Sequence, residues 1–114
     1  MRSWKIETND GTIITMELPS FRQVILNPDG SPGAPVPLDN NAVELKTATG
    51  VVMFSDSEIE TGERLNGDFR FKTATGQYVG IPVMTGISKL VVTGIVGNNS
   101  TAIEFEQILR FEAT

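Results

Sequence analysis

The sequence contains neither cysteine nor histidine. Without cysteine there is no disulfide framework, no thiolate nucleophile and no cysteine-based metal site. Without histidine the chain lacks the side chain best suited to proton transfer near neutral pH, which is also the commonest metal ligand. Together these absences argue against hydrolases of the triad type and against zinc chemistry. We therefore expect a protein that is not an enzyme and that has no cofactor and no metal.

Basic residues are scarce as well. Lys and Arg number 9 against 14 Asp and Glu, so the net charge is −5 and the pI is about 4.6. A surface of this sign repels phosphate backbones, and we expect no nucleic-acid partner. No apolar run approaches the ~20 residues that span a bilayer, and we expect no membrane association. The N-terminus enters a strand pattern without an apolar leader, which predicts intracellular synthesis without a signal peptide.

The 114 residues fit one domain, 1–114, with 39% hydrophobic and 20% charged residues as in ordinary globular proteins. Within it, residues 46–50 (Lys-Thr-Ala-Thr-Gly) recur unchanged as residues 72–76. Each copy lies between runs that alternate apolar and polar residues, which is typical of a hairpin tip. The identity has two explanations: a true duplication, or convergence on one favourable turn.

The apolar faces predict the register of the first hairpin, residues 4–16. A three-residue loop ending in Gly11 pairs Trp4 with Met16 and Ile6 with Ile14, which gives one apolar side. Trp4 then belongs to the core.

The same three-residue loop, ending in glycine, is predicted for both copies of the repeat. It pairs Leu45 with Met53 in the first copy and Phe71 with Val79 in the second. The second pairing places Tyr78 on the outer face of its hairpin.

Further strands are predicted at 21–26, 87–96 and 101–111, the last as one unbroken, central strand. Residues 27–30 (Asn-Pro-Asp-Gly) form the strongest turn signal, with Gly30 at positive φ. Ser55 and Glu58 fit a capping box at the start of a short helical connector that Gly62 could end. The fold class that follows is all-β: an antiparallel β-sandwich or small barrel of about eight strands joined by tight hairpins, with at most one short helix.

A proline-rich segment at 31–41 follows the 27–30 turn. Pro35 and Pro37 have the same parity, so one side of a strand there lacks N–H donors. The segment is therefore either an edge that blocks aggregation or an extended arm that docks on a neighbouring subunit.

An acidic cluster lies in the connector at Asp56, Glu58, Glu60 and Glu63. The alternating oxygen ligands and central glycine of a helix-loop-helix calcium site are not matched by its spacing. With a single Trp and a single Tyr the chain also makes a poor stacking platform for sugars, and a carbohydrate-binding β-sandwich is the alternative hypothesis.

Some strands are apolar on both sides. In the predicted register Phe54 and Val52 share a face with Glu44 and Lys46, and Val91 and Ile95 alternate with apolar neighbours. Such strands occur where both faces of the sheet are covered or where one face meets another protein. We therefore expect a structural or assembly β-module, with protein as its partner, either a second copy in a homo-oligomer or a larger assembly. A phage virion component of the capsid decoration, cement, neck or tail kind fits this description. The residues expected to contact the partner are Tyr78, Pro35, Val36, Pro37 and Leu38.

Overall fold

The computed structural model describes residues 2–36, 42–84 and 88–114, and this part of the chain is all-β. Its strands are β1 (Ser3–Thr8), β2 (Ile13–Leu26), β3 (Pro32–Val36), β4 (Ala42–Thr47), β5 (Gly50–Ser55), β6 (Ile59–Arg64), β7 (Phe69–Thr73), β8 (Gly76–Pro82), β9 (Ser88–Val96), β10 (Asn99–Glu104) and β11 (Ile108–Ala113). Two 3-10 turns, η2 (Asp56–Glu58) and η3 (Phe105–Gln107), interrupt them.

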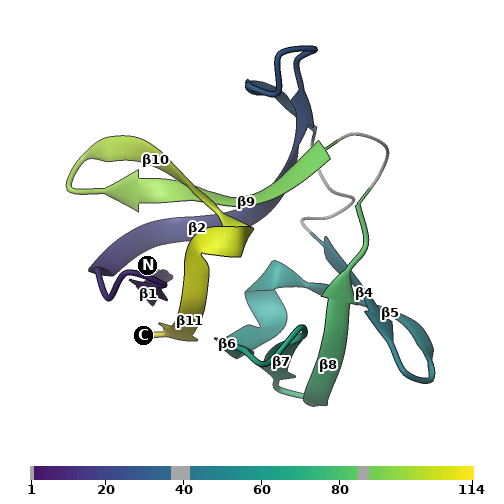
Figure 1. Cartoon of the computed structure of the whole chain (residues 1–114). Coiled ribbons are helices and arrows are strands. Elements are labelled where there is room, and N and C mark those ends of the chain that lie inside the picture. The colour runs from purple at the N-terminus through teal and green to yellow at the C-terminus, as the bar shows by residue number, and fades with distance from the viewer. Residues whose placement is uncertain (1, 37–41, 85–87) are drawn as a thin grey trace.

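The strands form one antiparallel sheet (Figure 1). Ten of them follow the order β10-β9-β2-β1-β11-β6-β7-β8-β4-β5, and β3 pairs with the second part of β2. The prediction of an antiparallel all-β fold is confirmed, but the strands form a single sheet that is not closed, which is neither the two-sheet sandwich nor the barrel that we expected. About eight strands was an underestimate, and two 3-10 turns replace the single expected helix.

The order of the strands has an approximate twofold symmetry. Strands β4 to β8 form a first half, and β9 to β11 together with β1 and β2 form a second half with the same pairing order. The halves meet at β6 and β11, which are equivalent strands, and Gly62 pairs there with its own equivalent, Phe111. Figure 1 shows the two corresponding hairpins, β4–β5 and β9–β10, projecting on opposite sides of the molecule. Because the second half joins both ends of the chain, the repeat is circularly permuted.

The repeated pentapeptide is not this repeat, since both copies lie in the first half, at the β4–β5 and β7–β8 turns. Each copy makes the same local contacts. The Thr47 hydroxyl accepts from the N–H of Thr49 (3.3 Å) and donates to the Gly50 carbonyl (2.7 Å). Thr73 does the same with Thr75 and Gly76 (both 3.2 Å). Hydroxyl-closed turns of this kind explain the identity as a shared local solution.

These turns contain two residues rather than three, and the predicted register was wrong by one. Thr47 pairs with Gly50, and Leu45 with Val52. The threonine hydroxyl closes the turn one residue early, so glycine becomes the first residue of the strand. Val51 and Met53 therefore point outward.

The shift also corrects the position of Tyr78. Phe71 pairs with Tyr78, not with Val79. The Tyr78 ring stacks on Phe54 at 5.4 Å between centroids and packs against the core. Its predicted place on the outer face was wrong, and Val79 occupies that face.

The register of the first hairpin was confirmed, with Trp4 paired to Met16 and Ile6 to Ile14. Gly11 has φ +89°, as the three-residue loop requires. The β2 strand then continues through a bulge, where Leu18 has φ 50°, so the predicted strand at 21–26 is the second part of β2.

The last predicted strand is broken. The η3 turn separates β10, at one end of the sheet, from β11, which lies centrally between β1 and β6. Arg64 holds this turn by donating to the carbonyls of Phe105 (2.6 Å) and Ile108 (2.9 Å). The capping box at Ser55 and Glu58 is confirmed, but it starts only the single turn η2, and Gly62 lies inside β6.

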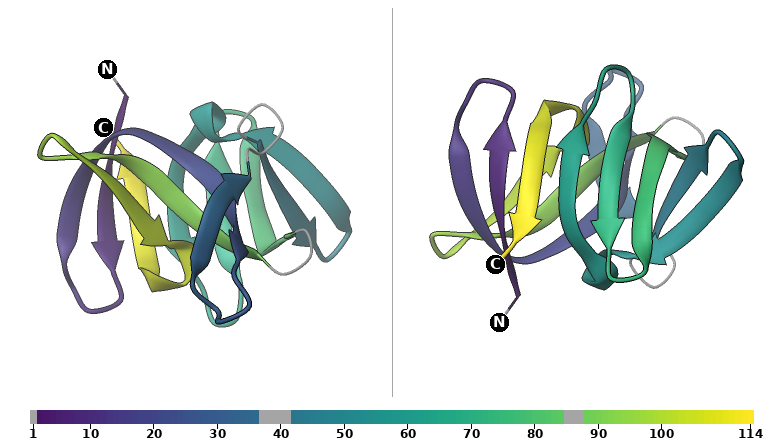
Figure 2. Two further views of the ribbon diagram at one scale, coloured as in Figure 1. Left: turned by 90° about the horizontal axis from the view of Figure 1, so that it is seen from above. Right: turned by 90° about the horizontal axis from the view of Figure 1, so that it is seen from below.

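The sheet is strongly curved (Figure 2). The core that it encloses is rich in aromatic side chains. Trp4 is fully buried, as predicted, and stacks on Phe111 with centroids 4.4 Å apart. The other buried rings are Phe21, Phe54, Phe69, Phe71 and Phe105.

Candidate functional site

The outer face of the sheet has a charged centre. On β1, β11, β6 and β7 the outward residues form ion pairs, Arg110 with Glu7 (3.7 Å) and Arg70 with Glu63 (3.5 Å). These side chains are exposed or half-buried, so each pair contributes little to stability. They keep the middle of this face hydrated.

One end of the outer face is apolar instead. We call Val51, Met53, Val79 and Ile81 the apolar patch. Their exposed fractions are 57%, 62%, 39% and 56%. The register places Ile81, Lys46 and Val51 in one row across β8, β4 and β5, with Met53 beside Glu44 in the next. The apolar side chains lie on β8 and β5, and the exposed Lys46 and Glu44 of β4 lie between them. Exposed apolar side chains gathered at one end of a sheet mark interaction surfaces.

The equivalent end of the other half is less apolar, although Ile95 and the exposed Leu18 lie there, and the contrast at the four patch positions is informative. In the first half, the residues side by side across β8, β4 and β5 are Ile81, Lys46 and Val51. In the second half, the equivalent residues across β2, β9 and β10 are Glu17, Ile95 and Ser100. The positions equivalent to Met53 and Val79 are Ala102 and Thr15. The same strand geometry is thus stable with polar or small side chains, so the fold itself does not require the apolar patch.

The patch ends at an unprotected edge. The strand β5 is the last of the series, and no described strand pairs with its outer side. Natural sheets shield such edges with charges, prolines or bulges. The β5 sequence, Gly-Val-Val-Met-Phe-Ser, has no charge and no proline, and its pairing with β4 is regular.

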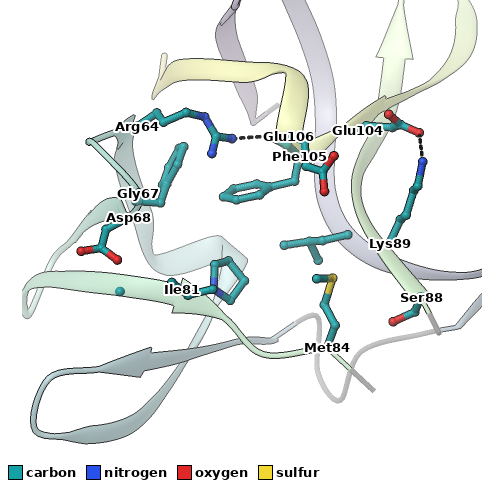
Figure 3. Close-up of a pocket in the computed structure, with 14 residues that line it drawn as sticks. Arg64, Gly67, Asp68, Ile81, Met84, Ser88, Lys89, Glu104, Phe105 and Glu106 are labelled. Atoms are coloured by element: carbon teal, nitrogen blue, oxygen red, sulfur yellow. Dashed lines mark hydrogen bonds and ion pairs between the residues drawn. The ribbon is translucent and has the colours of Figure 1, made fainter. Parts of the chain in front are cut away.

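A hollow of about 180 Å³ lies where β8 approaches β9 and η3 (Figure 3). Its apolar lining includes Phe69, Leu90 and Phe105, and charged residues surround the rim. Three of the rim charges have partners: Lys89 pairs with Glu104 at 3.0 Å, and Arg64 donates to the η3 carbonyl of Phe105. The volume is below the ~300 Å³ of typical ligand pockets. The hollow is therefore a weaker candidate than the apolar patch.

The acidic cluster of the connector is dispersed. Asp56 is buried and accepts from the Phe21 N–H and the Ser20 hydroxyl, both at 3.1 Å, and pairs with Arg2 at 3.5 Å. Glu58 instead caps η2 by accepting from the Ser55 N–H. Within the described ranges no group of three or more acidic side chains is placed to hold a metal ion.

Two carboxyl groups in exposed turns have shifted pKa values. Hydrogen bonds from the Thr8 hydroxyl and the Thr12 backbone hold the pKa of Asp10 below its usual 3.8. The hydroxyl and backbone N–H of Ser31 lower the pKa of Asp29 in the same way. Both carboxylates close turns, and neither lies near the apolar patch or the hollow.

The predicted contact residues are not brought together at the patch. Tyr78 lies on the opposite face, against the core. Pro35 and Val36 pair through their backbones with Val24 and Gln23 of β2, a strand of the other half of the sheet. Pro37 and Leu38 lie outside the described residues. The two-sided apolar strands did point to β5, although the outward residues are Val51 and Met53 rather than Val52 and Phe54. Counting the threonine-closed turn as two residues would have found them.

In the described part of the chain, no helix is long and apolar enough to cross a membrane. No protein-family model, curated protein or solved structure matches this chain.

Proposed function

We propose that the protein is a non-enzymatic structural module that assembles with neighbouring protein subunits through the outer face of β8, β4 and β5. The apolar patch carries this proposal. Its four side chains are costly to leave in water, each offering roughly 1–3 kcal/mol on full burial. The equivalent strands of the other half show that the fold is compatible with polar residues at the same positions.

The wider role that fits such a module is that of a subunit in a larger homo-oligomeric or mixed particle, such as the decoration, cement, neck or tail component of a phage virion. A small, cysteine-free and histidine-free β-protein with an outward apolar surface suits this setting. A second contact through Pro35, Val36, Pro37 and Leu38 remains a prediction. No observation favours carbohydrate binding, because all eight aromatic side chains belong to the described part and none stands free of the core.

The test is the oligomeric state of the purified protein over a range of concentrations, by light scattering and sedimentation. We expect reversible association that Ile81→Thr weakens at least fivefold. Ile13→Thr is the matched control, since Ile13 is 58% exposed but lies on β2, outside the patch. A protein that stays monomeric at every concentration contradicts the proposal, as does equal weakening by both variants.

A further inference from the structure

The backbone of β5 has a defined set of free hydrogen-bonding groups. The N–H of Val83 donates to the Glu44 carbonyl at 2.8 Å, so Glu44 directs its backbone groups toward the β8 side. Backbone groups alternate along a strand, so Leu45 and Thr47 direct theirs toward β5. Their partners Val52 and Gly50 are thus bonded to β4. The N–H and C=O groups of Val51 and Met53 consequently point to the open edge.

The open stretch is short because both ends are closed. At one end the β4–β5 turn begins, and at the other the Ser55 N–H donates to Glu58 in the capping box. A strand that docks here has two residues, Val51 and Met53, to which it can bond fully. The same two residues supply the outermost side chains of the apolar patch.

From this geometry we propose that β5 pairs antiparallel with β5 of a second copy of this chain, in the register that places Val51 opposite Met53 of the partner subunit. This inference rests on the proposed function and specifies its partner. The twofold axis passes midway between the Val52 residues of the two copies. Because the backbone groups of Val52 are already bonded to β4, these two residues form a non-hydrogen-bonded pair. The two Val51–Met53 pairs are then hydrogen-bonded, and the sheets of the two copies become one.

The charges beside β5 favour this register. Lys46 lies in the row of Val51, and Glu44 lies in the row of Met53. Pairing Val51 with the partner's Met53 therefore places Lys46 and the partner's Glu44 in the same row, with opposite charges across the seam. Two neighbouring registers also keep the edge-facing backbone groups paired. One places Val51 opposite the partner's Val51, which puts the two Lys46 residues in one row. The other places Met53 opposite the partner's Met53, which puts the two Glu44 residues in one row. The charges in such a row are three strand spacings, about 14 Å, apart, so screening leaves only a small preference for the mixed register.

A second copy is also a partner that suits the rest of the edge. The pairing places the Val51 and Met53 side chains of the two copies next to one another, so the two apolar patches meet at their β5 ends. The other end strand, β10, offers Ser100 and Ala102 at the equivalent positions. It gains no apolar contact from the same pairing, so association is expected through β5 alone.

Single cysteines test the register directly, because the natural chain has none. In a non-hydrogen-bonded pair the Cα atoms are about 4.5 Å apart, which lies within the range that disulfides bridge. We expect Val52→Cys to form a covalent dimer on mild oxidation at least tenfold faster than Thr101→Cys, its equivalent on β10. A mixture of Val51→Cys and Met53→Cys should cross-link, and each alone should not. The contribution of the apolar patch is tested with Met53→Lys, which should abolish association. Ala102→Lys, at the equivalent position of β10, is the control and should leave association unchanged.

The outcomes separate the two proposals. If the wild type associates and Ile81→Thr weakens it, but Val52→Cys does not cross-link, the self-pairing of β5 is wrong and the proposed function stands. Cross-linking of Val51→Cys or Met53→Cys alone shows a different register and overturns the inference as stated. If the wild type stays monomeric, the proposed function fails, and this inference fails with it.

Discussion

The ring of Phe111 lies against Gly62, the residue that pairs with it where the two halves of the fold meet. A Cβ atom at Gly62 would lie 2.3 Å from Cε1 of Phe111 and 2.7 Å from Cε1 of Phe69. Because the two positions are equivalent in the halves, a symmetric pair of large side chains would compete for one space. The combination of glycine and phenylalanine resolves this conflict, and the ring also stacks on Trp4.

Gly62→Ala should therefore destabilise the protein by about 2–3 kcal/mol, by overpacking against rings that have no free space. The measurement is chemical denaturation followed by Trp4 fluorescence. Because the strain arises at Phe111, combining Gly62→Ala with Phe111→Leu should cost less than the sum of the two single changes. Strict additivity would show that the ring does not set the cost.

The sequence predicted the all-β class and the first hairpin because both follow from alternation and from faces, which are local signals. It predicted the other two hairpins one residue out of register, since the Thr47 and Thr73 hydroxyls close their turns in a way that side-chain alternation does not reveal. A shift of one residue reverses every side chain. This is why Tyr78 was placed outside and Val52 was taken for an outward residue.

Other features depended on contacts between segments distant in sequence. The break at Phe105–Gln107 had a local sign, because Gln107 interrupts the apolar face of the run, but the turn is held by Arg64, more than forty positions earlier. Few residues are identical at positions equivalent in the two halves: Ile59 matches Ile108, but Gly62 is equivalent to Phe111 and Val51 to Ser100. The circularly permuted symmetry is visible only in the strand order.

Gly50→Val and Gly76→Val should each destabilise by roughly 1–2 kcal/mol. The two glycines have φ values of 138° and 156°, which side chains with a Cβ rarely adopt. Nothing lies within 4 Å of a Cβ at Gly50, so strain rather than collision is the cause there. Thermal unfolding measures both, with Ala48→Ser in the same turn as the control. No loss of stability at either site would show that the turns relax into another conformation.

Lowering the pH should weaken the turns that contain Asp10 and Asp29. Their pKa values are depressed in the folded protein by hydrogen bonds from Thr8 and Ser31. The stabilisation from such groups is present above the unfolded value of 3.8 and is lost as the pH falls through the lower, folded pKa. We expect the free energy of unfolding to fall below pH 4, and to fall less steeply in the Asp10→Asn, Asp29→Asn double variant. Carboxyl titration by NMR should place both groups below 3.8, and values above it would contradict the hydrogen bonds.

The ion pair of Asp56 with Arg2 ties the N-terminus to the first 3-10 turn. Asp56 is 2% exposed, and its carboxylate accepts from Phe21 N–H and the Ser20 hydroxyl. Asp56→Ala leaves these donors and part of the Arg2 guanidinium without an acceptor, at a cost of about 2–4 kcal/mol. Glu60→Ala, on the exposed face of β6, should change stability by less than about 0.5 kcal/mol. Urea denaturation of the two variants gives the comparison.

Arg2→Ala alone should destabilise the protein less than Asp56→Ala does. The two hydrogen bonds to Asp56 remain in that variant, and Arg2 is the half-exposed member of the ion pair. The reverse order would mean that the charge of Arg2, rather than the hydrogen bonds of Asp56, holds the turn in place.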